Sequence, residues 1–246
     1  IKIFRHIRQS LIMENKTGKY FKYAIGEIIL VVIGILLALQ INNWNEDRKD
    51  VILEINILKD IRSDLKENIN NLSQGIIYTK SSLFNNLKVI ELCEQKTPYN
   101  DSLLIYFSDF AGYWDPDFTY AGFENLKSIG VNLVSNAELR KQIINLIEVE
   151  MDILDNSDMS RQNQISSTMF LPLAKKYLHR KFDSNIEYQV YEPTDYENMI
   201  NDPEFYNVCT EIAYRQSRSI IRYGQFNQKT SALILEINKE IEKLKS

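Results

Sequence analysis

The first part of the chain contains one apolar run that has no polar side chain. It extends from Ile28 to Leu39, and with its flanks from Tyr23 to Ile41 it approaches the length, about 20 residues, that a helix needs to cross a bilayer. Tyr23 before the run and Trp44 after it are residue types typical of the membrane interface. The alternative is a buried helix of a soluble core, and the lack of any polar face across about three turns argues against it. The pattern therefore predicts a transmembrane helix at residues 19–45.

After Glu46, apolar residues recur at the heptad positions of a helix. The first glycine is Gly75 and the first proline is Pro98, so the pattern predicts one helix of about eleven to thirteen turns that can continue the apolar segment. Arg62 and Thr79 interrupt the apolar stripe. This interruption favours packing within the chain over a coiled coil with another chain. The stripe residues are Ile55, Leu58, Leu65, Ile69, Leu72, Ile76, Leu83 and Ile90.

The remaining segments also show helical spacing. Asp202 and Pro203 have the N-cap acid and N1 proline of a helix start, and Ser135 with Glu138 forms a capping box before another long helix. Residues 183–201 lack a periodic pattern and are predicted to be irregular. The low counts of glycine, 8, and proline, 5, favour long helices. The predicted fold class is all-α: one N-terminal transmembrane helix followed by an elongated helical bundle.

Basic residues on the N-terminal side set the predicted orientation. Six lysines or arginines and a single acid precede Tyr23, whereas Glu46, Asp47 and Asp50 follow the apolar run closely. The positive-inside rule then places the N-terminus in the cytoplasm. The helix is predicted to lie in the inner, cytoplasmic membrane of a Gram-negative bacterium, with residues 46–246 as a periplasmic domain.

Residues 1–18 combine basic side chains with apolar ones at helical spacing. They are predicted to form a cytoplasmic amphipathic segment on the inner leaflet, and an ordinary basic n-region with chance spacing is the alternative. The apolar run is followed by QINNWN, which has no small-x-small cleavage site. An uncleaved anchor is therefore favoured over a cleaved signal peptide. The residues expected to contact membrane lipid are Lys2, Phe4, Arg5, Ile7 and Arg8.

Glu27 is the one charged side chain between Tyr23 and Ile41. A charge at the bilayer centre costs about 2.5–3.5 kcal/mol and less near an edge, so such a residue usually faces protein or water. Gly34 and Ala38 form a small-xxx-small pair that allows another helix to approach closely. We expect this face to pack against a membrane helix of a second copy or of a partner subunit; a Glu27 that reaches the interface alone is the alternative. The face consists of Glu27, Val31, Gly34, Ala38 and Ile41.

The block from Tyr23 to Glu46, YAIGEIILVVIGILLALQINNWNE, resembles the signature of a family of small bacterial envelope proteins catalogued as a domain of unknown function. The basic stretch before it and the weaker pattern from Phe123 to Gly130, followed by Leu139, are also similar to that family. The membrane block is long and specific, and the similarity beyond it is diffuse. The resemblance implies a single-span envelope protein and no established activity.

The sequence lacks the motifs of common enzyme and metal sites. The formal net charge of −4 over 246 residues argues against general nucleic-acid binding. There are two histidines, and no HExxH, CxxC, glycine-rich phosphate loop or nucleophile elbow occurs. Asp115 and Asp117 flank a proline turn but lack the ligand run of a calcium loop, and Asp152, Asp155 and Asp158 indicate a solvated helix face. We therefore expect no enzyme, no metal and no cofactor.

The two cysteines, Cys93 and Cys209, fit no zinc or redox motif. One interpretation is a pair of small buried side chains on helices. The other is a disulfide in the oxidising periplasm, which requires Cα atoms within about 7 Å of each other.

Two groups of residues are candidates for a partner surface. Arg215, Arg218 and Arg222 form a basic stripe on one helix face, which could receive an acidic partner or a lipid or polysaccharide phosphate, or simply be solvated. The segment from Tyr106 to Tyr120 is rich in aromatic residues. It either closes the core of the bundle or, if exposed, forms a binding surface through Tyr113 and Trp114.

Three functions fit these features of the sequence. The first is a non-enzymatic accessory or scaffold subunit of a cell-envelope membrane complex, which contacts membrane lipid and other membrane subunits or itself and binds no nucleic acid. The second is a periplasmic sensor or signalling subunit. The third is a subunit of an oligomeric ion-conducting or motor assembly that uses Glu27.

Overall fold

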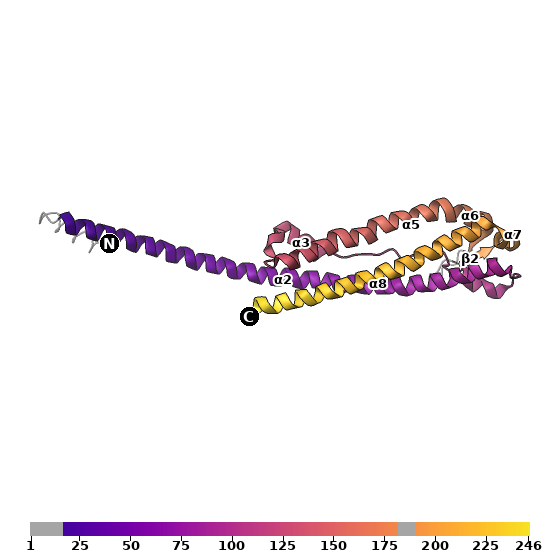
Figure 1. Cartoon of the computed structure of the whole chain (residues 1–246), viewed down its shortest axis with the longest axis horizontal. Coiled ribbons are helices and arrows are strands. Elements are labelled where there is room, and N and C mark those ends of the chain that lie inside the picture. Colours follow the sequence, from indigo (N-terminus) through magenta and orange to yellow (C-terminus); the bar gives the residue numbers. More distant parts are fainter. Residues whose placement is uncertain (1–16, 182–189) are drawn as a thin grey trace. The chain divides into compact units, whose positions relative to one another are not determined.

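The computed structural model describes residues 17–181 and 190–246, and it confirms the all-α fold class (Figure 1). Most of the described chain is helical, and two short strands form one small antiparallel sheet. Short π-helical and 3-10 segments interrupt or connect the α-helices. The elements are α2 (Thr17–Gln95), η1 (Asp101–Phe107), α3 (Ala121–Ile129), η2 (Val131–Leu133), α4 (Ala137–Ile144), η3 (Asn145–Met151), η4 (Ile153–Asp158), α5 (Met159–Ile165), η5 (Ser166–Phe170), α6 (Leu171–Tyr177), β1 (Leu178–Lys181), β2 (Val190–Pro193), α7 (Tyr196–Asn201) and α8 (Pro203–Lys245).

The chain divides into two compact units, Ile1–Leu53 and Glu54–Ser246. The described part of the first unit is the beginning of α2, which is one helix long and apolar enough to cross a membrane. Its most apolar window of 18 residues has a mean hydropathy of 2.6, and 0% of that window is buried within the protein. The lipid-contacting residues predicted within residues 1–16 lie outside the described ranges.

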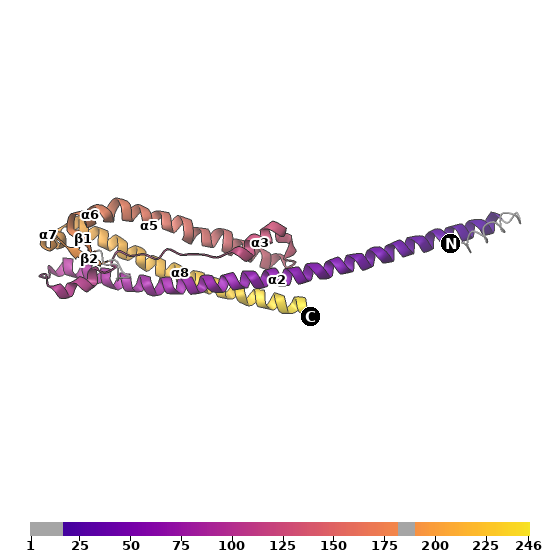
Figure 2. The ribbon, with the colours of Figure 1, turned by 180° about the vertical axis from the view of Figure 1, so that it is seen from behind.

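In the second unit, long helical stretches lie side by side, and we call them the rods (Figures 1 and 2). They are the C-terminal part of α2, the helix α8, and the arm that runs from α4 through α5 to α6. The predicted long helix is confirmed, since α2 runs unbroken to Gln95. Its heptad leucines Leu58, Leu65 and Leu72 are buried against the other rods, so the stripe packs within the chain as predicted.

The core consists of two hydrophobic clusters at the two ends of the second unit. One cluster includes Phe107, Phe110 and Phe205, and the other includes Leu65 and Phe123. On α2 the second cluster precedes the first along the chain, and on α8 the order is reversed, because the two helices are antiparallel. This antiparallel pairing lets each end of the unit build its own core.

Buried polar residues lie between the two clusters. Thr79, Ser82 and Asn86 on α2 and Gln216 on α8 are almost fully buried. The Gln216 Nε2 atom donates to two carbonyl oxygens of residues 110–112, at 3.0 and 2.9 Å. These bonds hold the loop after η1 against α8. The polar residue Thr79, which interrupts the apolar stripe, therefore lies in the protein interior and not at the surface.

The start of α4 differs from the predicted capping box by one residue. Asn136 is the N-cap, and its Oδ1 atom accepts from the backbone N–H groups of Glu138 and Leu139 at 3.2 and 3.1 Å. Ser135 instead donates to Glu54 Oε1, from its backbone N at 2.8 Å and from its Oγ at 3.1 Å. The predicted capping box is wrong, because Ser135 donates its hydrogen bonds to the carboxylate of Glu54, 81 residues away in the sequence.

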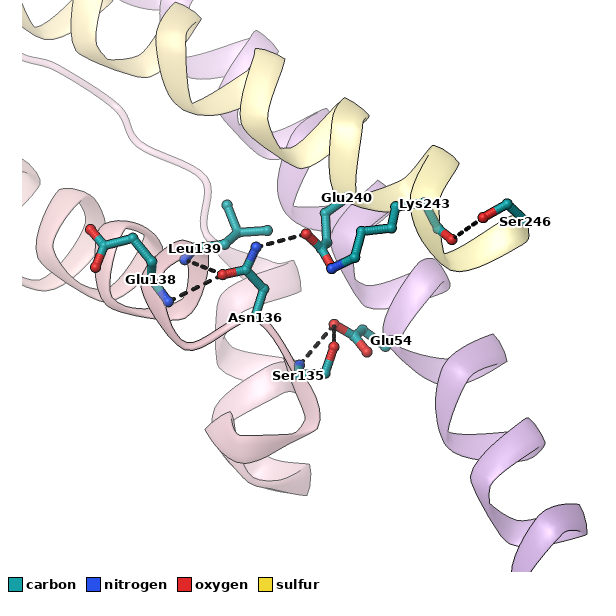
Figure 3. A network of polar contacts seen from close by, with 8 residues as sticks. All are labelled: Glu54, Ser135, Asn136, Glu138, Leu139, Glu240, Lys243 and Ser246. Carbon is teal, nitrogen blue, oxygen red and sulfur yellow. Dashed lines mark hydrogen bonds and ion pairs between the residues drawn. The ribbon is translucent and has the colours of Figure 1, made fainter.

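Two buried carboxylates meet this turn (Figure 3). Glu54 on α2 is 2% exposed and Glu240 on α8 is 5% exposed. Asn136 Nδ2 donates to Glu240 Oε2 at 2.7 Å, and Lys243 Nζ lies 2.9 Å from Glu240 Oε1. Burial would raise the pKa of Glu240, but the hydrogen bonds from Lys243 and Asn136 outweigh it and leave this pKa below its ordinary value. The turn at residues 135–136 thereby joins α2, α4 and α8.

The segment predicted to be irregular at residues 183–201 is partly regular. Leu178 pairs with Pro193 and Arg180 with Tyr191 in the antiparallel sheet of β1 and β2, and α7 follows at Tyr196. The prediction was wrong for residues 190–193 and for α7, because strands and helices this short carry too few residues to show a period. The buried side chains of Tyr191 and Tyr196 belong to the first hydrophobic cluster.

The helix start predicted at Asp202 is confirmed. Asp202 is the N-cap of α8, and its Oδ1 atom accepts from the backbone N of Glu204 at 2.8 Å. Its Oδ2 atom accepts from the Tyr177 hydroxyl at 2.6 Å and lies 3.1 Å from Lys176 Nζ. The hydrogen bond from Tyr177, with those from Glu204 and Lys176, lowers the pKa of Asp202 to about 2.

We expect Asp202→Asn to cost about 1–2 kcal/mol of stability near neutral pH, because asparagine keeps the cap but loses the charge-assisted bonds. A lowered folded-state pKa gives stability that is present above the ordinary value of 3.8 and is lost as the pH falls toward about 2. The stability difference between the wild type and the variant should therefore shrink across that window. Urea denaturation of both proteins at several pH values measures it, and a difference that stays constant down to the lowest pH contradicts the assignment.

Candidate functional site

The predicted packing face lies on the unbroken first part of α2. Val31 is 54% exposed and Ile41 is 67% exposed, and Gly34 and Ala38 between them are also exposed. A Cβ atom added at Gly34 would meet nothing within 4 Å. Among the described residues, none therefore covers the small-residue pair. What packs on this face stays a prediction.

The aromatic loop closes the core, which is the first of the two interpretations of this segment. Phe107 and Phe110 are fully buried. The Trp114 ring lies 5.9 Å from the ring of Tyr78, and a Cβ atom added at Gly75 would come within 2.5 Å of it. Only glycine leaves room for Trp114 at this point of α2.

Polar contacts also tie the two proposed surface aromatics to the bundle. Trp114 Nε1 donates to Asn71 Oδ1 at 3.2 Å, and the Tyr113 hydroxyl donates to Asn163 Oδ1 at 2.8 Å. Both side chains are half-buried. Tyr113 and Trp114 therefore contact the protein itself and do not form an exposed aromatic patch.

Cys93 and Cys209 belong to one hydrophobic cluster and are free thiols in the structure. Burial raises the pKa of Cys93 to about 11 and raises that of Cys209 well above its ordinary value. Because the thiolate is the reactive form, both thiols are inert toward exchange while the core stays folded. In the structure, the two cysteines are therefore buried free thiols and do not form a disulfide.

The predicted arginine stripe borders a cavity between α8 and the arm. Arg215, Arg218 and Arg222 lie on one side of the cavity. On the other side, Asp158 comes from the end of η4 and Arg161 comes from α5. The volume of the cavity is about 320 Å³. We call it the arginine pocket. Its lining residues are Asp158, Arg161, Gln162, Tyr214, Arg215, Arg218, Ser219 and Arg222.

Sequence reasoning found one wall of this pocket and missed the other. No pattern in the sequence marks Arg161, and the spacing of Asp152, Asp155 and Asp158 predicts a solvated helix face. In the structure Asp158 forms an ion pair with Arg222, 64 residues away in the sequence. Periodicity reports which residues share a helix face, but it does not report which helix lies opposite.

The aspartates that precede Asp158 lie near the proline turn. Burial raises the pKa of Asp155, and the charges of Asp115, Asp152 and Asp117 raise it further. Among the described residues, no group of three or more His, Cys, Asp or Glu side chains is placed to hold a metal ion.

These observations first define a class of protein: an all-α helical bundle whose N-terminal helix is long and apolar enough to cross a membrane. Within this class, residues 27–200 match the Family of unknown function (DUF6090), and the chain belongs to that family. The match begins in the apolar part of α2 and ends in α7, so it includes one wall of the arginine pocket and not α8. No curated protein and no solved structure matches the chain.

Proposed function

We propose that this protein is a non-enzymatic accessory or scaffold subunit of a cell-envelope membrane complex. In this proposal the apolar part of α2 spans the inner membrane, the N-terminus lies in the cytoplasm and the helical bundle lies in the periplasm. The observation that carries the proposal is the exposed apolar window of α2 together with its open small-residue face.

The exposure of the window supports a membrane helix over a core helix. Soluble proteins rarely expose an apolar patch larger than a few hundred Å², and here no part of an 18-residue apolar window is buried. A removable signal sequence is less consistent with α2, since this helix continues without a break from the apolar run to Gln95 in the second unit.

The open face supports assembly with another membrane helix. In lipid, helices associate through close backbone approach at small residues and through polar contacts, because the hydrophobic effect does not drive them together. Gly34 and Ala38 provide the close approach, and Glu27 on the same face provides a carboxylate about one turn inside the membrane edge. The helix that packs here comes from a partner subunit or from a second copy.

The helical bundle supports a scaffold role. Its three rods are joined at one end by the turn at Ser135 and Asn136. Nearer the middle, Asn86 Nδ2 on α2 donates to Gln216 Oε1 on α8 at 3.4 Å. Such non-local bonds tie the helices of the second unit together, which supports a domain that presents fixed surfaces to other proteins. Helical surfaces of this kind are suited to binding partner proteins. The proposed scaffold role requires binding alone and no catalysis.

The assembly proposal is tested with variants on opposite sides of the membrane helix. Ala38→Leu and Glu27→Leu should each reduce the assembled fraction about tenfold in native gels of crosslinked native membranes, because they remove close approach or the polar contact. Leu36→Phe, on the opposite side of the helix, is the matched control and should assemble normally. Mass spectrometry of the crosslinked band tells a partner subunit from a second copy. Full assembly of both test variants would refute the proposal.

A further inference from the structure

The arginine pocket concentrates positive charge in an acidic protein. Its lining holds four arginines and one aspartate, whereas the whole chain has a formal net charge of −4. Arg215, Arg218 and Arg222 follow one another at three- and four-residue intervals on α8, and like charges at this spacing repel each other. A bound anion would remove this repulsion.

The ion pairs within the pocket leave much of this charge available. Asp158 contacts Arg222, but its Oδ1 atom is 3.9 Å from Arg161 Nη1, the outer limit of an ion pair. Arg215 pairs with Glu211, a residue outside the pocket lining, at 2.8 Å. Arg218 forms no ion pair with any residue of ranges 17–181 and 190–246.

The size and chemistry of the pocket select the class of ligand. Small-molecule sites have volumes of roughly 300–1,000 Å³, so a cavity of about 320 Å³ admits a small group and not a protein helix. The planar guanidinium donates two parallel hydrogen bonds to a phosphate, which makes clustered arginines suited to phosphate recognition. Tyr214, which is 60% exposed, adds a hydroxyl and an aromatic ring at the border of the pocket.

We propose that the arginine pocket binds a small phosphate-bearing group, held by Arg161 from the arm and by Arg218 and Arg222 from α8. The group is either a soluble phosphate ester or the headgroup of a phospholipid. This inference concerns the second unit alone, and it does not depend on the proposed membrane complex. Under this proposal the arginine stripe is a binding surface for phosphate groups and not a merely solvated helix face.

Isothermal titration calorimetry tests the proposal with the full-length protein in nanodiscs of zwitterionic lipid and inorganic pyrophosphate as the probe. The wild type should bind saturably at one site. Arg218→Ala should weaken binding at least about tenfold, because a charge-assisted hydrogen bond is lost. Arg218→Lys should fall between the two, since lysine keeps the charge but not the two-pronged geometry.

Arg48→Ala is the matched control, because Arg48 is exposed on α2 in the first unit. This variant should bind pyrophosphate with the affinity of the wild type. Absence of saturable binding, or equal affinities of the Arg218 and Arg48 alanine variants, would overturn the proposal. A second set of nanodiscs, which contain phosphatidylglycerol, separates the two sources. If phosphatidylglycerol lowers the pyrophosphate affinity of the wild type, relative to zwitterionic nanodiscs, but not that of Arg218→Ala, the pocket binds a lipid headgroup. If the affinity of the wild type is the same in both kinds of nanodisc, the pocket binds a soluble phosphate ester.

Discussion

Two lysines in the middle of the apolar segment, Val32→Lys combined with Leu36→Lys, should release the protein from membranes. Each lysine at the centre of a bilayer helix costs about 2.5–3.5 kcal/mol, so the pair costs roughly 5–7 kcal/mol and reverses the preference for insertion. Both side chains are exposed, and both lie in the first unit. The helical bundle should therefore keep its stability, and flotation of lysed cells in a density gradient should find the variant outside the membrane fraction.

The matched control exchanges the same two positions without a charge, as Val32→Leu with Leu36→Val. This control should float with the membranes, as the wild type does. If the double-lysine protein also floats with them, the apolar part of α2 is not the segment that holds the chain in the membrane.

Gly122→Ala should destabilise the bundle by about 2–3 kcal/mol, the upper part of the range for overpacked sites. Gly122 is buried where α3 crosses α2, and its backbone N donates to Asp64 Oδ2 at 2.7 Å. An added Cβ atom would lie 2.6 Å from the backbone N of Ile61 and 2.8 Å from the backbone carbonyl carbon of Asp60. Backbone atoms in a helix cannot rotate away, so α3 would have to move off α2 and weaken that hydrogen bond.

Gly224→Ala is the control of opposite sign. Gly224 lies within α8, and an added Cβ atom meets nothing within 4 Å there. Alanine in a helix interior is favoured over glycine, so this variant should gain about 0.5–1 kcal/mol. Urea denaturation of the full chain in detergent, followed by near-UV circular dichroism, measures both changes. Equal shifts for the two variants would contradict the close contact between α3 and α2.

The features predicted correctly from the sequence depend on neighbours along the chain. The length of α2 follows from its apolar spacing and lack of breakers, and the start of α8 follows from Asp202 and Pro203. The stripe of Arg215, Arg218 and Arg222 likewise follows from spacing on one helix. Local rules were sufficient because these features need no information about distant segments.

The features that the sequence did not predict depend on residues far apart in the chain. Ser135 does not cap α4 because Glu54, on another helix, accepts its hydrogen bonds. Thr79 reads as a polar break in an apolar stripe, yet it is 1% exposed between the two clusters. The second wall of the arginine pocket became visible only when the fold placed Asp158 opposite Arg222. The spacing of residues along one helix does not report which residues of another helix lie opposite.

A photo-crosslinking scan of the apolar segment in native membranes tests the central proposal most directly. A photoreactive amino acid is placed at each position from 29 to 41 in turn, and adducts are detected on gels. The proposal predicts strong adducts at Val31, Gly34 and Ala38, which share the open face, and weak ones at Ile29 and Leu36 on the opposite side. Equal crosslinking around the helix, or none above background at Gly34 and Ala38, would contradict an assembly built on this face.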